Sequence, residues 1–242
     1  MSPMNAHANS NVNADANADA VANANTRADP RPETADDDLA SLVQTLIGSR
    51  YSVAPKRLLS PGPNPEQLLQ MVHAAACAPD HRALRPWRLI RIADHQRDAL
   101  ADLFEACSAE RGPPPSAADL AKSREKAYRA PTLLLAVLKT TPDDPEVPLT
   151  ERAVTLGAAL MGLLLTAHGQ GFGAMLTSGR AVRAPRFARA MGLADDEQAV
   201  CFVSIGTARI GKRPTRGQAQ DFLSDWLTGP VVPQAAPPTP GT

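Results

Sequence analysis

Cysteine is scarce in this 242-residue sequence, which contains only Cys77, Cys107 and Cys201. The three are odd in number and widely spaced, and none belongs to a Cys-x-x-Cys pair or stands at ligand spacing from a histidine. Disulfide frameworks and structural zinc sites show such spacings, so the sequence indicates neither. We expect no metal site and a reducing compartment, the cytoplasm.

A long apolar run is also missing. The longest, Ala153–Ala167, is shorter than the ~20 residues that a transmembrane helix needs, and it directly follows the charged residues Glu151 and Arg152. The N-terminal residues contain no apolar run typical of a secretory signal, and their acidic residues argue against a transit peptide. We therefore expect a soluble protein with no membrane partner.

An excess of charge of one sign is absent as well, because 25 basic and 25 acidic residues balance. The distribution is uneven: residues 1–38 hold seven acidic and two basic residues, which leaves a formal charge of +5 on the remainder. This mild excess favours a phosphate-bearing ligand. It is too small for a nucleic-acid-binding domain, and no basic stripe alternates with aromatic residues. We expect no nucleic-acid partner.

Both ends of the chain differ in composition from its middle. Residues 1–38 are mostly Ala, Asn and Asp without an aromatic residue, and residues 229–242 are rich in proline. Such segments bury too little apolar surface to offset the entropy that they would lose on ordering. We predict two disordered tails around a single domain at 39–228.

Apolar periodicity, caps and breakers predict the elements of this domain. Asn64 and Pro65 mark a helix start, as N-cap and first helical residue. The predicted helices cover 39–48, 64–76, 95–111, 116–128, 149–169 and 183–191. The predicted strands cover 87–92, 132–139, 174–178 and 199–206, and residues 217–227 form a helix or an arm. Because helices and strands mix without a strict βαβ repeat, the fold class is α+β.

The helix predicted at 149–169 is apolar nearly all round, which indicates burial on several sides. We expect it to be a long core helix. Its small residues would let another helix approach closely, and they are Ala153, Gly157, Ala158 and Gly162.

Two prolines bracket an unusual turn in the stretch CAPDHRALRPWRLI, residues 77–90. Asp80 and His81 are either solvated side chains of a polar loop or parts of a catalytic pair, which would need a nucleophile within reach. Adjacent side chains rarely point at the same atom, and this favours the solvated loop. A metal site is weaker still, because the histidines stand alone without close carboxylate partners.

Three loops contain residues that could bind a ligand. GSRYSVAPKR, residues 48–57, collects basic residues and a serine that suit a phosphate, although a solvated loop is an equally simple reading. GTARIGKRP, residues 206–214, offers Arg209, Lys212 and Arg213, which again either bind a phosphate or are solvated. AHGQGFGA, residues 167–174, follows a helix and lacks the nucleotide-binding patterns, so Gly169 is expected to be a helix C-cap.

Taken in order, five segments resemble the nitroreductase family of FMN-dependent oxidoreductases, and in particular its compact YdjA-like branch. They are SRYS, APDHRALRPWRLI, YRAPTLLLAVLK, AVTLGAALMGLLLTAHGQGFGAMLTSG and VSIGTARIGKRP. The resemblance covers residues 39–214 and neither tail. It implies a nitroreductase-like fold with a central, mostly antiparallel sheet flanked by helices. It also implies a homodimer with FMN bound at the subunit interface.

The resemblance also implies which residues contact the cofactor. For the phosphate and ribityl end these are Arg50, Tyr51 and Ser52, with Lys212 and Arg213 closing over the phosphate. The residues implied to reach the flavin from the other subunit are Pro79, Asp80, His81 and Ala83. Those implied along the isoalloxazine edge are Leu176, Thr177, Ser178 and Gly179. A turn implied to meet the nicotinamide, in competition with the helix-end reading, comprises Thr166, Ala167, His168, Gly169, Gln170 and Gly171.

If the resemblance holds, the flavin carries the chemistry and no side chain has a catalytic role of its own. Hydride would pass from NAD(P)H to the flavin and then to a nitroaromatic, a quinone or a similar small acceptor, in a ping-pong cycle. Two alternatives stay open: a flavin oxidase or dehydrogenase on the same scaffold, and a non-catalytic flavin- or partner-binding protein.

This sequence departs from the family's pattern at several positions. The extra residues APK before Arg57 leave open which of Lys56, Arg57, Lys212 and Arg213 contacts the phosphate. Ala83 stands where many relatives have Asn or Ser, and Arg85 replaces a common Gln.

Overall fold

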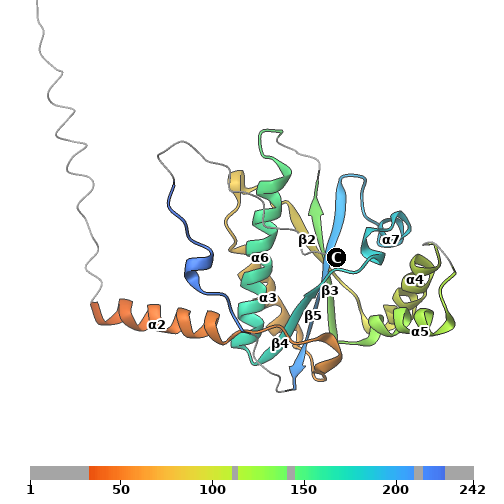
Figure 1. Ribbon diagram of the computed structural model, residues 1–242, viewed down its shortest axis with the longest axis horizontal. Coiled ribbons are helices and arrows are strands. Elements are labelled where there is room, and N and C mark those ends of the chain that lie inside the picture. Colours follow the sequence, from red (N-terminus) through yellow and green to blue (C-terminus); the bar gives the residue numbers. More distant parts are fainter. Residues whose placement is uncertain (1–32, 111–113, 141–144, 210–214, 227–242) are drawn as a thin grey trace, which may run out of the picture. The chain divides into compact units, whose positions relative to one another are not determined.

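The computed structural model describes residues 33–110, 114–140, 145–209 and 215–226 (Figure 1). The chain divides into two compact units, one that ends at Arg50 and one that begins at Tyr51. In the first unit, helix α2 (Glu33–Ser49) begins six residues before the predicted start at Leu39. Its acidic residues therefore lie inside the N-terminal turns, where the helix dipole favours negative charge. Residues 1–32 and 229–242 of the predicted tails lie outside the described residues.

The second unit is organised around an antiparallel sheet. Its strands are β1 (Leu58–Leu59), β2 (Trp87–Arg91), β3 (Thr132–Lys139), β4 (Phe172–Thr177) and β5 (Glu197–Ala208). Strand β5 pairs with β3 on one side and with β4 on the other, β2 lies outside β3, and β1 pairs with the end of β5. All four predicted strands are confirmed, as is the α+β class with an antiparallel sheet. Strand β1 was not predicted, because two residues are too few to show the alternation of side chains that indicates a strand.

Helices cover both faces of the sheet. Figure 1 shows α3 (Pro65–Ala76) and α6 (Leu149–Gly169) on one face, with α4 (Arg97–Ala109), α5 (Ala117–Glu125) and α7 (Pro185–Ala190) on the other side. Strand β3 reads as a continuous apolar run because its side chains alternate between the two resulting cores. This two-sided burial is why a run without polar alternation is a strand.

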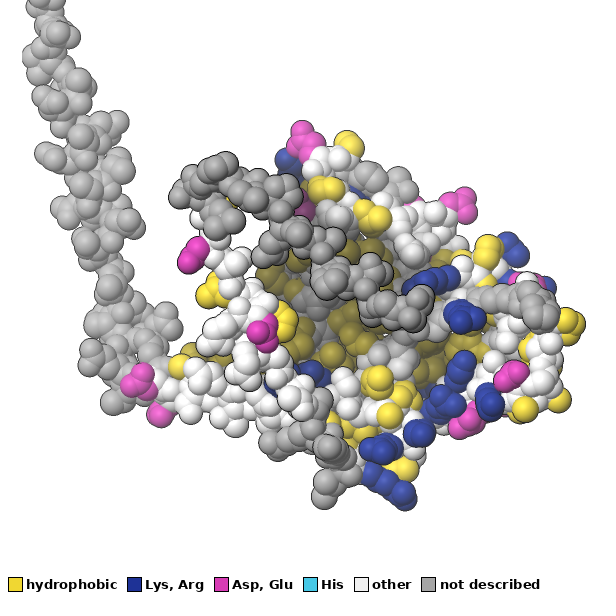
Figure 2. Space-filling model, viewed as in Figure 1, with side chains coloured by type: hydrophobic (Ala, Val, Ile, Leu, Met, Phe, Trp, Pro, Cys, Tyr) yellow, Lys and Arg dark blue, Asp and Glu magenta, His cyan; other side chains and the backbone are white. Residues whose placement is uncertain are grey.

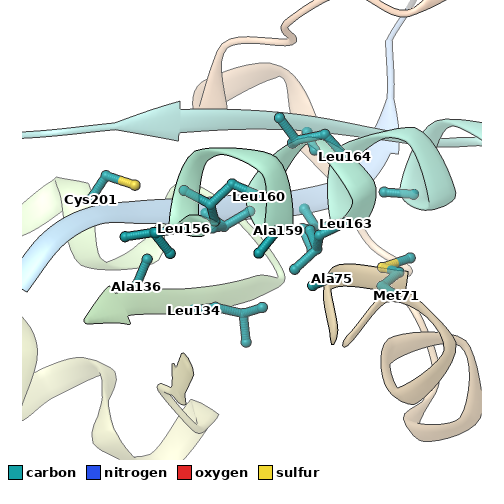
Figure 3. Close-up of a cluster of buried hydrophobic side chains, with 14 of the residues drawn as sticks. Met71, Ala75, Leu134, Ala136, Leu156, Ala159, Leu160, Leu163, Leu164 and Cys201 are labelled. Atoms are coloured by element: carbon teal, nitrogen blue, oxygen red, sulfur yellow. The ribbon is translucent and has the colours of Figure 1, made fainter. Parts of the chain in front are cut away.

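The core under α6 is shown in Figure 3. Leu134 and Ala136 of β3 meet Leu156 and Leu160 of α6, and Met71 of α3 closes the cluster. Each large apolar side chain buried there contributes about 1.5–3 kcal/mol. By length and composition α6 is the one described helix that could cross a membrane, but here it is the central core helix. The predicted long buried helix is thus confirmed.

One of the small residues of α6 allows close packing against α3. A Cβ atom added to Gly162 would lie 2.8 Å from the carbonyl oxygen of Ala74, closer than real Cβ contacts come. At Gly157 a Cβ atom would meet nothing within 4 Å in the single chain. The close approach predicted for this helix is therefore realised within the chain at Gly162.

Three phenylalanines form the centre of the second core. The rings of Phe104 (α4) and Phe187 (α7) both meet Phe202 (β5) edge-on, with centroid distances of 5.7 and 6.0 Å. Such edge-to-face pairs add about 0.5–1.5 kcal/mol beyond their area burial. They hold α4 and α7 on the sheet and give this face a rigid apolar floor.

Several predicted helices are shorter or divided. The helix predicted at 116–128 is α5 followed by a 3-10 turn at Lys126–Tyr128, and the one at 95–111 is a 3-10 turn at Asp94–Gln96 followed by α4. The helix predicted at 183–191 begins only at Pro185, which takes the first helical position. The described part of 217–227 holds one 3-10 turn, Ala219–Asp221, so it is an arm and not a helix.

Candidate functional site

A cavity of about 590 Å³ opens on the face of the sheet opposite α6. Its floor includes Phe104, Leu133 and Phe202 of the second core, together with the buried residues Cys107 and Ser204. The cavity is thus built on the buried aromatic core of this face. Its size lies within the range of about 300–1,000 Å³ that is usual for small-molecule and cofactor sites.

One wall of the cavity is the chain that leaves β4. The ladder between β4 and β5 ends at the pair Thr177 and Phe202, so Ser178 and Gly179 lie beyond it. Thr177, Ser178 and Gly179 all line the cavity, which brings together three of the four residues expected along the flavin edge. Leu176 is not among the lining residues, because side chains alternate along a strand and its neighbour Thr177 points to the cavity face.

The opposite wall was not predicted as a site. Ser123, Lys126 and Arg129 line it, at intervals of three residues along the end of α5 and the 3-10 turn that follows. In a 3-10 turn, side chains three residues apart lie on one face. The spacing of three residues in SREKAYR, residues 123–129, was the one sequence feature that could have indicated this wall. Without the wall at Thr177–Gly179, the same spacing also fits an ordinary exposed helix face.

The walls of the cavity are basic. Lys126, Arg129 and Arg180 line it, and among the residues that the structure describes no Asp or Glu does. Arg129 Nη2 lies 3.0 Å from Glu125 Oε2, and the hydrogen bond from Arg129 lowers the pKa of Glu125. In Figure 2, Lys and Arg side chains gather beside α5 and α7 on this part of the surface. Such a cavity attracts anionic or electron-rich groups.

The segment after Arg50 runs beside the start of β4. Ser52 forms a parallel bridge with Ala174, and the Val53 amide donates to the Ala174 carbonyl at 3.1 Å. Ser52 is exposed, Tyr51 packs against the small cluster around Val53, and Pro55 lines the cavity. Thr177 is the third residue after Ala174 along β4, a distance of about 10 Å at the usual rise per residue.

The other residues expected to hold the phosphate belong to the first unit or lie outside the described residues. Arg50 ends the first unit, where its amide donates to the Leu46 carbonyl at 3.3 Å. Lys212 and Arg213 lie outside the described residues. The Arg57 carbonyl accepts a hydrogen bond from the Arg209 amide at 3.2 Å, which joins the basic loop to the chain after β5.

The proline-bracketed turn has an unusual backbone. Arg82, Ala83 and Arg85 have φ values of 59°, 52° and 49°, a left-handed conformation that is rare outside glycine. The Asp80 carboxylate accepts a hydrogen bond from the Arg85 amide at 2.7 Å and helps to stabilise this turn. Strained backbone of this kind persists only where surrounding contacts support it, and it is concentrated at functional sites.

Two side-chain contacts link this turn to Glu151 of α6 and to Glu146, three residues before that helix. His81 Nδ1 lies 2.8 Å from Glu151 Oε2, and Arg82 Nη2 lies 2.8 Å from Glu146 Oε2. The Asp80 carboxylate is thus bound to the Arg85 amide, and the His81 ring is bound to Glu151. None of Pro79, Asp80, His81 and Ala83 lines the cavity of the same chain.

The residues assigned to the nicotinamide form the C-terminal end of α6. Thr166 Oγ1 donates to the Gly162 carbonyl at 3.0 Å, and the Gln170 amide donates to the Thr166 carbonyl at 2.9 Å. The expected cap at Gly169 is wrong, since Gly169 is the last helical residue, Gln170 is the C-cap and Gly171 takes the positive φ of 84°. None of the six residues 166–171 lines the cavity.

Comparisons with known proteins agree with this fold. The model of the nitroreductase family matches residues 47–207. The Escherichia coli K12 protein YdjA, named as an NAD(P)H nitroreductase, is 30% identical over 168 residues, which are 69% of this chain and 88% of that protein. A Haemophilus influenzae protein with the same activity in its name is 34% identical over 163 residues, covering 67% of this chain and 86% of its own.

Solved structures show the same fold at lower identity. A nitroreductase-like protein from Bacillus cereus superposes with a TM-score of 0.63 at 20% identity, covering 77% of this chain and 96% of that one. A structure from Desulfovibrio desulfuricans, named as a nitroreductase in complex with FMN, has a TM-score of 0.59 at 18% identity, with 77% and 98% covered. The fold, the family model and the YdjA match lead to one conclusion: this chain belongs to the nitroreductase family, a family of enzymes.

Proposed function

We propose that the protein is an FMN-dependent oxidoreductase that passes hydride from NAD(P)H to a nitroaromatic, a quinone or a similar small acceptor. The observation that carries the proposal is the basic cavity between Thr177–Gly179 and Lys126. Relatives at 30% and 34% identity are named as NAD(P)H nitroreductases, and a structural neighbour was solved with FMN.

The residues of the cavity fit a flavin. Phe104 and Phe202 offer an apolar floor for a flat ring, while Ser123 and Thr177 offer hydroxyls at the walls. The volume of about 590 Å³ accommodates a ring system of that size. When bound, FMN accepts a hydride from the nicotinamide and passes it to the acceptor, in separate half-reactions.

The chain's own residues would supply positive potential around the ring. Lys126, Ser178 and Gly179 line the walls, and among the described residues no Asp or Glu does. The Lys126 ammonium and the backbone amides of Ser178 and Gly179 would face the ring. Preorganised donors of this kind stabilise the negative charge that a flavin gains on reduction, and they do so most strongly where water is excluded. They would therefore favour acceptance of hydride from NAD(P)H.

The phosphate would bind near the start of β4. The bridge between Ser52 and Ala174 lies about 10 Å along β4 from Thr177, and Arg50 and Tyr51 directly precede Ser52. Arginine and serine suit a phosphate because they give charge-assisted hydrogen bonds. Lys56, Arg57, Lys212 and Arg213 are further candidates to close over the phosphate. Residues 166–171 remain the proposed nicotinamide turn.

The flavin would lie at the interface of a homodimer. Pro79–Ala83 do not line the cavity of their own chain, so a second copy would bring them to it. Large apolar side chains are exposed in the single chain on the outer side of the α3–α6 layer and on the arm, with Leu69, Val154 and Trp226 at 69%, 71% and 90%. Where such side chains adjoin one another they form the kind of apolar patch that marks an interaction surface.

The same properties bear on compartment and partners. Cys77, Cys107 and Cys201 are not joined in disulfides, and burial raises the pKa of the Cys201 thiol to about 11, which leaves it unreactive. This is in keeping with a reducing cytoplasm, where disulfides are rare. Its proposed partners are a second copy and small molecules, with neither nucleic acid nor membrane.

An absorbance spectrum of the purified protein, followed by anaerobic titration with NADH and NADPH, tests the proposal. A bound flavin gives a yellow protein whose visible absorbance bleaches as reductant is added and returns with a nitroaromatic or a quinone. A colourless protein that takes up no added FMN would contradict it. Preferred return of colour with oxygen would instead identify an oxidase, and a yellow protein without turnover would identify a flavin-binding protein.

A further inference from the structure

We infer that Arg97 is a positioning residue that holds the Lys126 wall of the cavity in place, an inference that rests on the proposed flavin site. Arg97 Nη1 donates to the Ala127 carbonyl at 3.0 Å, and Nη2 donates to the Pro131 carbonyl at 3.2 Å. Ala127 directly follows Lys126 in the 3-10 turn. The guanidinium thus spans from α4 to both ends of the segment that leads into β3.

Arg97 is in an unfavourable place for a positive charge. It is only 7% exposed and is the first residue of α4, where the helix dipole is also positive. Its nearest carboxylate oxygen is Asp94 Oδ1 at 4.0 Å from Nε, on a side chain that is 96% exposed. Burial lowers the pKa of Arg97, because desolvation disfavours the charged form. In this buried position the Arg97 guanidinium is stabilised by its hydrogen bonds to the Ala127 and Pro131 carbonyls.

The segment 123–129 presents two different faces. Ser123, Lys126 and Arg129 line the cavity. Three of the residues between them, Arg124, Ala127 and Tyr128, are instead hydrogen-bonded to residues of α4. Arg124 forms ion pairs with Asp102 and Glu105, and Tyr128 donates a hydrogen bond to Asp98. A rotation of this segment about its axis would therefore move all three cavity residues together.

Among the contacts that hold the segment 123–129 on α4, we expect the hydrogen bonds of Arg97 to contribute most to its position. The carboxylates of Asp102 and Asp98 belong to exposed residues, and exposed pairs contribute little, typically under about 1 kcal/mol. The bond from Arg97 to Ala127 is buried, and leaving a buried carbonyl unpaired is costly. The 3-10 turn itself has no side-chain cap, and short 3-10 turns have weak internal hydrogen bonds.

The hydrogen bonds of Arg97 affect the cavity through the position of the Lys126 ammonium. A lysine has a flexible four-carbon stem, so the backbone beneath it decides which region the ammonium samples. Loss of the Arg97 hydrogen bonds would let the turn move and would weaken the positive potential at the flavin. Arg97 itself does not line the cavity, so this effect would pass through Lys126.

The test compares the reduction potential of bound FMN in wild type, Arg97→Met, Lys126→Met and the double variant. We expect Lys126→Met to lower the reduced-to-oxidised ratio about tenfold at fixed potential, which is about 30 mV for two electrons. Arg97→Met should shift the potential in the same direction, and the double variant should match Lys126→Met. Additive shifts, or an unchanged potential in Arg97→Met, would overturn the inference.

A second measurement does not need the flavin. In the apoprotein, amide hydrogen exchange of residues 124–130 should be about tenfold faster in Arg97→Met, while Arg88→Met, which removes another bidentate arginine, leaves it unchanged. Unchanged exchange in Arg97→Met overturns the inference. If Arg97→Met does not fold, Arg97→Lys, which keeps one hydrogen bond, takes its place. A wild type that binds no FMN refutes the proposed function, and exchange alone then decides on Arg97.

Discussion

Arg88 and Glu197 join β2 to β5 across the intervening strand β3. Arg88 Nε lies 2.5 Å from Glu197 Oε1 and Nη2 lies 2.7 Å from Oε2, in a bidentate geometry. Glu197 Oε2 also accepts from the Ala194 amide at 3.0 Å. The pair therefore fixes the entry of β5, the strand that supplies Phe202 and Ser204 to the cavity floor.

This pair makes stability depend on pH. The hydrogen bond from Arg88 lowers the pKa of Glu197, so the folded state favours the carboxylate. The stability that results is present above the unfolded pKa of about 4.3 and is lost as pH falls through the lower folded value. We expect Glu197→Gln to reduce the free energy of unfolding by about 1–2 kcal/mol at neutral pH. Urea unfolding should show this difference shrinking below about pH 4, and a constant difference would contradict the assignment.

Two glycines of α6 form a matched pair for testing helix packing. Gly162→Ala should destabilise the protein by about 1–3 kcal/mol, because the new Cβ would lie 2.8 Å from the Ala74 carbonyl oxygen. Gly157→Ala has open space in the single chain, so helix propensity should make it neutral or stabilising by up to about 1 kcal/mol. Thermal or denaturant unfolding measures both. Equal effects of the two substitutions would contradict the packing argument.

Sequence patterns found those features of the fold that depend on local periodicity. The run at 132–139 was readable because burial on both faces of the sheet removes polar residues from the whole strand. The helix at 149–169 was readable because its length and its many apolar residues favour a packed helix over a strand. The sequence did not show that the segments of Lys126 and Thr177 form two walls of one cavity. Lys126 and Thr177 are separated by more than 50 residues, and only the pairing of β4 with β5 and the packing of α4 bring their segments to one cavity.

The same limit explains the errors at element ends. Divided helices such as α5 with its 3-10 turn keep a helical apolar spacing, so the break at Lys126 leaves no trace in composition. The hydrogen bonds from Arg97 that accompany this break link residues 30 and 34 positions apart. The pairing of His81 with Glu151, 70 residues away, was hidden for the same reason.

Binding of FMN should depend on the residues that precede the Ala174 bridge. Arg50→Ala removes a guanidinium that we propose to contact the phosphate, and the Kd for FMN should rise about ten- to a hundredfold, as for the loss of a charge-assisted hydrogen bond. Fluorescence quenching on titration of the apoprotein with FMN measures this. Arg189→Ala, at an exposed position on α7, is the control and should leave the Kd unchanged. Equal affinities in Arg50→Ala and wild type would remove Arg50 from the phosphate site.

If the protein is a homodimer with FMN at its interface, a substitution on the interface surface should also weaken FMN binding. Val154 is 71% exposed on α6, and Val154→Glu would place a carboxylate in the proposed interface, where an unpaired charge is costly to bury. Sedimentation should show a shift from dimer to monomer, and FMN should be lost in parallel, because the turn at 79–83 of a second copy would no longer reach the cavity. Ala121→Glu, at an exposed position on α5, should change neither property. Val154→Glu that stays dimeric would show that α6 is outside the interface, and a monomer that retains FMN at wild-type affinity would show that one chain completes the flavin site by itself.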